Sequence, residues 1–131
     1  MVKIKKVPQH NAVESIRKPH YISFGFRYLH EASYVNCNKA DFFIKHFKRL
    51  QQLSQLTWEQ IDVSNRHSFG YEKIPVASIK VKVNLTEDVK NLMVFRATGD
   101  NHSFLGIREE DVFQVVFIES DFGDIYAHGK K

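Results

Sequence analysis

The side chains best suited to acid–base chemistry lie in one short segment, Arg66-His67-Ser68-Phe69-Gly70-Tyr71-Glu72. This segment holds a cation, an imidazole, a phenol and a carboxylate. Cleavage of RNA without a metal ion needs a base for the 2′-hydroxyl, an acid for the leaving oxygen and a cation for the phosphate charge. The segment therefore predicts a site with Arg66, His67 and Glu72. The alternative is structural, with Phe69 and Tyr71 packing a loop whose charged residues are solvated.

Further candidates lie downstream. Arg96 follows the apolar run 92–95, where a charged side chain either reaches the sheet surface or points into a site. Tyr126 and His128 are two positions apart, so on a strand they would face the same side. Chain ends are often poorly ordered, which favours the interpretation that this pair has no function. The apolar strand that precedes them favours the opposite, because it would place both beside the sheet.

The sequence contains no motif for a cofactor or a metal ion. It lacks a glycine-rich phosphate loop, a cysteine pair, a His-Glu-x-x-His helix and a Gly-x-Ser-x-Gly turn. The seven histidines are scattered, and none are spaced two or four apart, as ligands from one element would be. We therefore expect no cofactor and no metal, so that any nuclease here would be a metal-independent endoribonuclease.

Length and composition indicate one domain. A chain of 131 residues is the usual size of a single core, and eleven Phe, five Tyr and one Trp supply large rings to fill it. Cys37 is the only cysteine, so no internal disulfide can form, and a reducing compartment is favoured. No apolar run approaches the ~20 residues that span a bilayer, and no apolar stretch follows the basic start. We expect a cytoplasmic protein without a membrane partner.

The net charge of +4 is concentrated in residues 1–20, which carry five basic side chains and one acidic one. This stretch is predicted to be a basic arm or irregular lead-in to a single domain over 21–131. Within that domain, the segment 39–56 is basic and the segment 99–124 is acidic. A uniformly basic nucleic-acid coat is excluded, but one basic face remains open. Its candidate nucleic-acid-binding residues are Lys45, Lys48, Arg49 and Arg66.

The apolar spacing predicts one long helix from Lys39 to Leu56, with Asn38 as its N-cap. Its apolar stripe is expected to comprise Phe43, Phe47, Leu50, Leu53 and Leu56. The basic side chains Lys45, Lys48 and Arg49 are expected away from that stripe. A capping box at Thr57-Trp58-Glu59-Gln60 predicts a second, short helix.

The remaining segments alternate between apolar and polar residues or are wholly apolar, which is typical of strands. Strands are expected at 21–30, 79–85, 91–98, 103–107, 112–118 and 125–128, with a loop at 64–76. The run 112–118 is expected to be buried on both faces. The fold class is therefore α+β, an antiparallel sheet of four to six strands with one long and one short helix packed on one face.

The order of helix, short helix, Phe95-Arg96, hairpin, apolar strand and closing Tyr126-x-His128 resembles the RelE/ParE-type toxin superfamily over residues 39–128. The resemblance implies two helices on a small antiparallel sheet and cleavage of messenger RNA. It implies that Arg96 neutralises the scissile phosphate and that Tyr126 and His128 are the C-terminal groups, with His128 as acid or base. The long loop 57–78, the extra strand at 21–30 and the acidic 99–124 region depart from that pattern.

Two classes of function are thus expected. The first is an RNA-directed ribonuclease or translation-blocking toxin, whose partners would be RNA or the ribosome and a protein antitoxin. Its catalytic residues would be drawn from Arg96, His67, Glu72, Tyr126 and His128. The second is a non-catalytic module that binds protein or nucleic acid, as a homo-oligomer or as a subunit of a larger complex. The aromatic excess and the separated charges favour such an interface.

Overall fold

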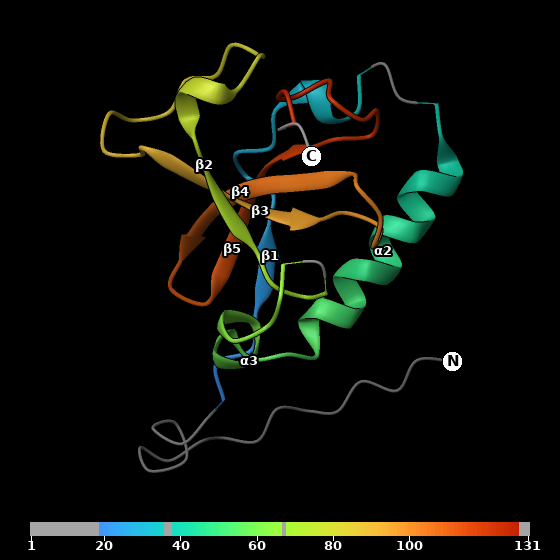
Figure 1. Cartoon of the computed structure of the whole chain (residues 1–131), viewed down its shortest axis with the longest axis vertical. Coiled ribbons are helices and arrows are strands. Elements are labelled where there is room, and N and C mark those ends of the chain that lie inside the picture. Colours follow the sequence, from blue (N-terminus) through green and yellow to red (C-terminus); the bar gives the residue numbers. More distant parts are fainter. Residues whose placement is uncertain (1–18, 36–37, 67, 129–131) are drawn as a thin grey trace.

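The computed structural model describes residues 19–35, 38–66 and 68–128 (Figure 1). Its centre is a five-stranded sheet in the order β1-β5-β4-β3-β2. The strands are β1 (Ser23–Gly25), β2 (Glu72–Pro75), β3 (Asn91–Arg96), β4 (Ser103–Glu109) and β5 (Val112–Ile118). Only β1 runs parallel to its neighbour, β5, and the other pairs are antiparallel. The expected α+β class with a mostly antiparallel sheet is confirmed.

Two helices cover one face of this sheet. The long helix α2 spans Ala40–Ser54 and the short helix α3 spans Trp58–Asp62; two single-turn 3-10 helices, η1 (Glu31–Ser33) and η2 (Val76–Ser78), lie in the connections. α3 begins with the predicted capping box, in which Thr57 N donates to Gln60 Oε1 at 2.9 Å and Gln60 N donates to Thr57 Oγ1 at 3.2 Å. α2 begins after Lys39 rather than Asn38, and no side chain caps it.

The buried face of α2 differs from the predicted stripe. It consists of Phe42, His46, Arg49, Leu50 and Leu53, whereas Phe47 is 63% exposed. Polar side chains enter this face because each finds a main-chain carbonyl: His46 Nδ1–H donates to Ala97 O at 2.7 Å, and Arg49 Nη2 donates to Ser68 O. The placement of Arg49 on a solvated basic face is therefore wrong.

The first core lies between the helices and the sheet. Trp58, Phe95, Phe104 and Phe113 are almost fully buried there, with Leu53 and Ile61 from the two helices. β5 contributes Phe113 and Val115 to this core, and Val116 and Phe117 to the core on the opposite face. Burial of β5 on both faces is confirmed.

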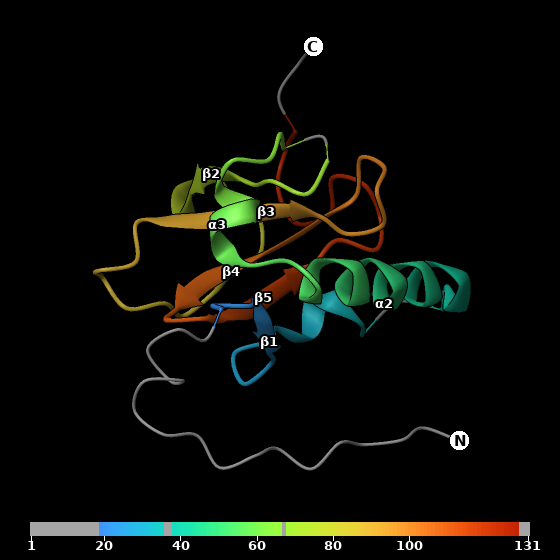
Figure 2. The same ribbon diagram turned by 90° about the horizontal axis from the view of Figure 1, so that it is seen from below.

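The second core is covered by chain without regular structure. The segment 76–89, coloured yellow, lies on the side of the sheet away from α2 in both ribbon views (Figures 1 and 2). Ile79, Val81, Val83 and Leu85 are partly buried against this core. The alternation predicted for 79–85 is thus used for packing, but the segment is not a strand. Its backbone meets the rest of the protein at single points, such as the bridge between Ile79 and Tyr126.

The other strand predictions need three corrections. β2 lies within the predicted loop 64–76 and forms the edge of the sheet, where Pro75 is tolerated because its missing N–H faces away from β3. The predicted strand 21–30 is regular only over Ser23–Gly25, and Phe26 and Tyr28 beyond it are exposed. At Gly25, β1 approaches β5 closely, since a Cβ there would lie 2.2 Å from Gln114 Oε1. The last segment makes one bridge instead of a strand.

Two further expectations concern residues that the structure does not describe. The predicted basic arm lies outside the described residues, apart from Pro19 and His20. His67 also lies outside them. Within the described part of the chain, no helix combines the length and apolar character needed to cross a membrane.

Candidate functional site

A cavity of about 550 Å³ opens on the sheet face opposite the helices. Its polar lining comes from β2, β3 and β4, from Arg66, Ser78 and Asn101 in the connections, and from Tyr126 and His128 near the C-terminal end. Five residues predicted from the sequence line it together: Arg66, Glu72, Arg96, Tyr126 and His128. Residues separated by up to 62 positions therefore share one wall only because β3 pairs with β2 and β4, and the C-terminal segment folds back over them.

His128 is held by a carboxylate that the sequence did not point to. Its Nε2 lies 2.9 Å from both oxygens of Glu119, a side chain with no solvent exposure. Glu119 also accepts hydrogen bonds from Ser103 N at 3.2 Å and Gly123 N at 2.9 Å. Burial raises the pKa of Glu119, and the bonds from His128 and Gly123 oppose that rise. Nε2–H donates to the carboxylate, so Nδ1 is the nitrogen with a lone pair to offer.

Two aromatic rings fix the plane of the His128 imidazole. Phe122 stacks on it with ring centroids 4.0 Å apart, and Tyr126 stacks on it at 4.2 Å. The interplanar angles are 29° and 27°, so the three rings form one column. An imidazole that is stacked on its faces and hydrogen-bonded at Nε2 has little rotational freedom, as a positioned acid or base requires.

Tyr126 contributes a hydroxyl to the cavity wall. Its Oη lies 3.2 Å from Ser103 Oγ, and burial raises the pKa of the phenol. The phenol therefore stays protonated at neutral pH, and either hydroxyl of this pair can be the donor. The Tyr126 backbone is held by its bridge to Ile79.

The cationic side of the cavity consists of Arg66 and Arg96. Arg66 Nη1 contacts Glu72 Oε2 in a half-exposed ion pair, which orients the guanidinium from the β2 edge. Arg96 Nη1 donates to Asp100 O at the β3–β4 turn. The Asp100 side chain in turn accepts from Thr98 Oγ1 at 2.7 Å and His102 N at 2.9 Å. The turn that positions Arg96 is thus itself held by hydrogen bonds.

The other predicted nucleic-acid-binding residues lie elsewhere. Lys45 and Lys48 are exposed on α2 and do not line this cavity. Arg49 is buried, with its guanidinium 4.5 Å from the centre of the Phe69 ring. The part of the chain that the structure describes contains no group of three His, Cys, Asp or Glu side chains placed to hold a metal ion.

Sequence reasoning missed Glu119, Ser103 and Phe122. Glu119 had one available signal, since it directly follows the apolar run 112–118, and a carboxylate at the end of a buried strand is costly unless it has partners. Ser103 and Phe122 carried no such signal. Ser103 enters the site through its pairing with Arg96 across β3 and β4.

Comparison with protein-family models, curated proteins and solved structures finds no match to this chain.

Proposed function

We propose that this protein is a metal-independent endoribonuclease, a translation-blocking toxin in the manner of the RelE/ParE superfamily that its element order resembles. One observation carries the proposal: an imidazole fixed by Glu119 shares a cavity with Arg66 and Arg96. Acid–base catalysis at a phosphate needs this combination of a positioned proton acceptor and nearby cations. The substrate would be RNA, free or on the ribosome, in the cytoplasm that the lone cysteine favours.

In this reaction the 2′-oxygen of the substrate attacks phosphorus while the bond to the 5′-oxygen breaks. The proton of the 2′-hydroxyl passes to Nδ1 of His128, and Glu119 balances the imidazolium that forms. Arg96 and Arg66 stabilise the charge on the phosphate oxygens. Water protonates the leaving 5′-oxygen, so the products are a 2′,3′-cyclic phosphate and a 5′-hydroxyl end.

The remaining groups would orient the substrate. Tyr126, whose phenol stays protonated, would donate a hydrogen bond to a phosphate oxygen rather than a proton. Glu72 would hold Arg66 in place through their ion pair. His67 stays a prediction as a further acid, next to Arg66 in the chain.

The test is cleavage of a single-stranded RNA of mixed sequence by the purified full-length protein, with EDTA present. We expect cleavage of RNA, a 2′,3′-cyclic phosphate end and no cleavage of the same sequence with 2′-deoxyribose. Arg96→Ala should abolish cleavage and relieve growth arrest on expression, whereas Lys45→Ala, on the exposed face of α2, should do neither. Normal growth and intact RNA with the wild-type chain would contradict the proposal.

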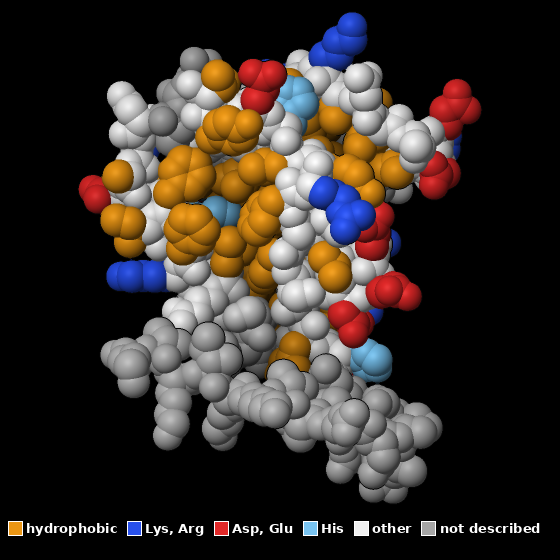
Figure 3. All heavy atoms as spheres, turned by 180° about the vertical axis from the view of Figure 1, so that it is seen from behind, with side chains coloured by type: hydrophobic (Ala, Val, Ile, Leu, Met, Phe, Trp, Pro, Cys, Tyr) orange, Lys and Arg blue, Asp and Glu red, His pale blue; other side chains and the backbone are white. Residues whose placement is uncertain are grey.

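A second function is favoured by a separate surface. Exposed apolar side chains gather on one face of the molecule (Figure 3), from the segment 26–35 and the outer side of α2. They are Phe26, Tyr28, Tyr34, Val35, Ile44 and Phe47. Between them lies an apolar groove of about 350 Å³. Contiguous apolar patches on a protein surface commonly mark interaction sites.

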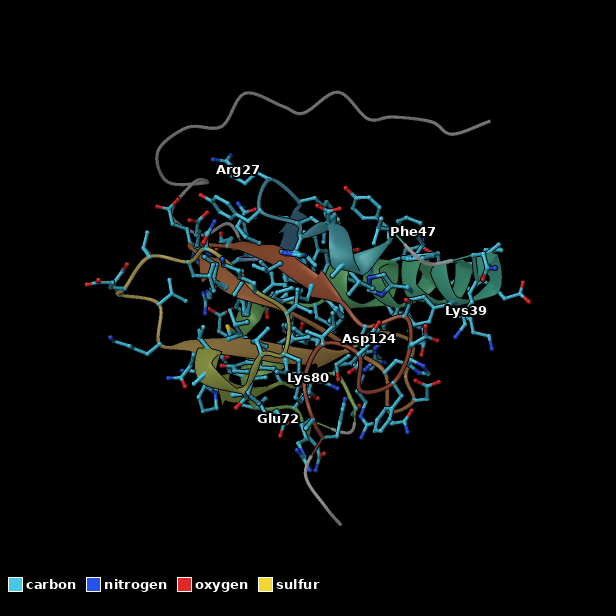
Figure 4. The ribbon with its side chains drawn as sticks, turned by 90° about the horizontal axis from the view of Figure 1, so that it is seen from above. Arg27, Lys39, Phe47, Glu72, Lys80 and Asp124 are labelled. Carbon is cyan, nitrogen blue, oxygen red and sulfur yellow. The ribbon has the colours of Figure 1, made fainter. Side chains whose placement is uncertain are left out.

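The charges around this groove favour one kind of partner. Arg27, Lys45 and Lys48 are exposed on the segment and the helix that carry the apolar side chains, against Glu31 and Asp41, so basic charge is in excess there. They fit a protein segment whose apolar side chains are flanked by acidic ones, such as an antitoxin, better than a second copy with the same basic rim. Figure 4 places Phe47 and Glu72 apart, so a partner here would leave the cavity open.

This second function is tested with two helical peptides that share a leucine face and differ only in glutamate or lysine flanks. We expect the glutamate peptide alone to bind, and Phe47→Asp to abolish its binding without changing the thermal midpoint. Equal binding of both peptides, or light scattering that shows a dimer lost in Phe47→Asp, would overturn the choice of an acidic partner.

A further inference from the structure

The column of stacked rings at the cavity ends in Phe122, and packing of the fold does not explain why this ring is exposed. Phe122 is 51% exposed although His128 covers one of its faces at 4.0 Å. The His102 ring lies at 82° to it with centroids 6.4 Å apart, so the exposed half comes from the surface that His128 and His102 leave uncovered. Phe122 also belongs to neither hydrophobic core. It is an aromatic platform at the rim of the cavity.

The segment that carries this ring is fixed at several points. Gly123 N donates to Glu119 Oε2 at 2.9 Å, and Asp124 N donates to Asp121 O at 3.1 Å. Lys39 at the start of α2 contacts the Asp121 carboxylate. Lys80 Nζ donates to Gly123 O at 2.6 Å (Figure 4 labels Lys80 beside Asp124). A ring held in this way offers a flat surface at little conformational cost, which is what stacking with a ligand needs.

The surrounding charges separate two kinds of ligand group. Arg66 and Arg96 line the cavity and suit a phosphate, whereas the charges beside Phe122 offset one another, because Lys39 pairs with Asp121 and Lys80 lies near Asp124. An uncharged, flat group is therefore the fitting ligand at Phe122. Every nucleobase has such a face, and stacking of bases on aromatic side chains is the common device for binding single-stranded nucleic acid.

We propose that Phe122 stacks on an unpaired base of a single-stranded RNA whose neighbouring phosphate lies between Arg66 and Arg96. This inference rests on the proposed ribonuclease function and names its substrate class. A double helix is excluded from the site, because its bases are already stacked and paired. The column Phe122–His128–Tyr126 then extends into the substrate, so that stacking places the phosphate next to the imidazole.

Binding is tested separately from cleavage, with a fluorescent 2′-deoxy oligonucleotide that cannot be cleaved and that the full-length protein can bind. We expect Phe122→Leu, which keeps apolar bulk without an aromatic face, to weaken binding roughly tenfold. Phe122→Trp should bind at least as tightly as the wild type. Lys90→Ala, at an exposed position outside the cavity, should be neutral, and a duplex of the same sequence should compete at least tenfold more weakly.

The outcomes separate the two proposals. If the wild type binds the single strand and Phe122→Leu loses that binding, but no RNA is cleaved, base stacking survives and the ribonuclease fails. If RNA is cleaved and Phe122→Leu binds and cleaves like the wild type, the ribonuclease survives and Phe122 only shields His128. Equal competition by the duplex would also overturn the stacking proposal. A thermal midpoint for each variant shows whether it is folded.

Discussion

The Nε2 atom of His128 lies 2.9 Å from both carboxylate oxygens of the fully buried Glu119. The two residues are nine positions apart, at the end of β5 and at the last described position of the chain. The pair therefore closes the turn 119–128 and fixes one imidazole nitrogen. It also leaves Nδ1 without a hydrogen-bond partner among the described residues. A purely structural contact would only need to close the turn. A catalytic histidine would also need a fixed ring and a nitrogen that is free to accept a proton.

Kinetics can separate these roles. His128→Ala should lower the rate of RNA cleavage by roughly 10²–10⁴-fold, the usual contribution of a positioned acid or base. Glu119→Gln keeps the shape but has one acceptor oxygen, so it loses the bond from Ser103 or from Gly123 together with the charge that balances the imidazolium. It should lower kcat less than His128→Ala and leave KM unchanged. Single-turnover rates and oligonucleotide binding would be measured for both variants. A drop in binding that matches the drop in rate would show that the pair only shapes the cavity.

The buried arginine of α2 is expected to stabilise the fold rather than to bind RNA. Arg49 stacks on Phe69 at 4.5 Å and donates to the Ser68 carbonyl. Arg49→Ala should reduce the free energy of unfolding by about 2 kcal/mol, because both contacts are lost. Lys48→Ala, its exposed neighbour, should change it by less than ~0.5 kcal/mol. Urea titrations of the two variants compare them directly, and equal values would contradict the structural role.

The fold and the site differ in how far the sequence predicts them. Arg96, Tyr126 and His128 could be selected because their local surroundings are unusual, and the capping box of α3 is a local signal. The buried face of α2 could not be assigned correctly. Its two polar members, His46 and Arg49, are stabilised by carbonyls of Ala97 and Ser68, which lie 51 and 19 positions away. Apolar periodicity cannot anticipate such partners.

Dependence on partners that are distant in the sequence also explains why Glu119 was not predicted. Its partners Ser103 and His128 reach it only through the β4–β5 pairing and the return of the C-terminal segment. The segment 79–85 shows the converse error. Its alternation is real and buries one side, but β2 occupies the sheet edge beside β3, and the segment packs against the second core instead of pairing with a strand.

The turn that positions Arg96 should make the fold sensitive to strong acid. Burial alone would raise the pKa of Asp100, but bonds from the His102 backbone, Thr98 and the His102 ring outweigh it and lower this pKa to about 2. A lowered pKa stabilises the fold above the unfolded value of 3.8, and that stability is lost as pH falls towards 2. Asp100→Asn should remove about 1 kcal/mol at pH 7 and flatten this dependence.

Denaturation at pH 7, 4 and 2.5 would check this prediction. Glu87→Gln, at an exposed position, is the control and should retain the wild-type slope. A slope in Asp100→Asn equal to that of the wild type would mean that other carboxyl groups cause the acid sensitivity.

His46 should make stability fall under mildly acidic conditions. Burial lowers its pKa below the ordinary 6.5, and the bond to Ala97 O only partly opposes this. Its Nε2 is buried without a hydrogen-bond partner. A proton added at Nε2 would therefore find no acceptor, which makes the charged form costly in the folded state. The unfolded chain binds this proton more readily than the folded one. Stability is therefore full above the unfolded pKa and is lost as pH falls through 6.5 towards the folded pKa.

His46→Gln isolates this effect, because its amide can still donate to Ala97 O but does not titrate. A difference of one in pKa between the folded and unfolded states is worth about 1.4 kcal/mol, so the loss between pH 8 and pH 5 should be measurable by urea denaturation. The variant should lose less stability over this range. His20→Gln is the control: Asp111 raises the pKa of His20, so His20 favours the fold at low pH and cannot cause the loss. An unchanged slope in His46→Gln would show that His46 is protonated within the folded core.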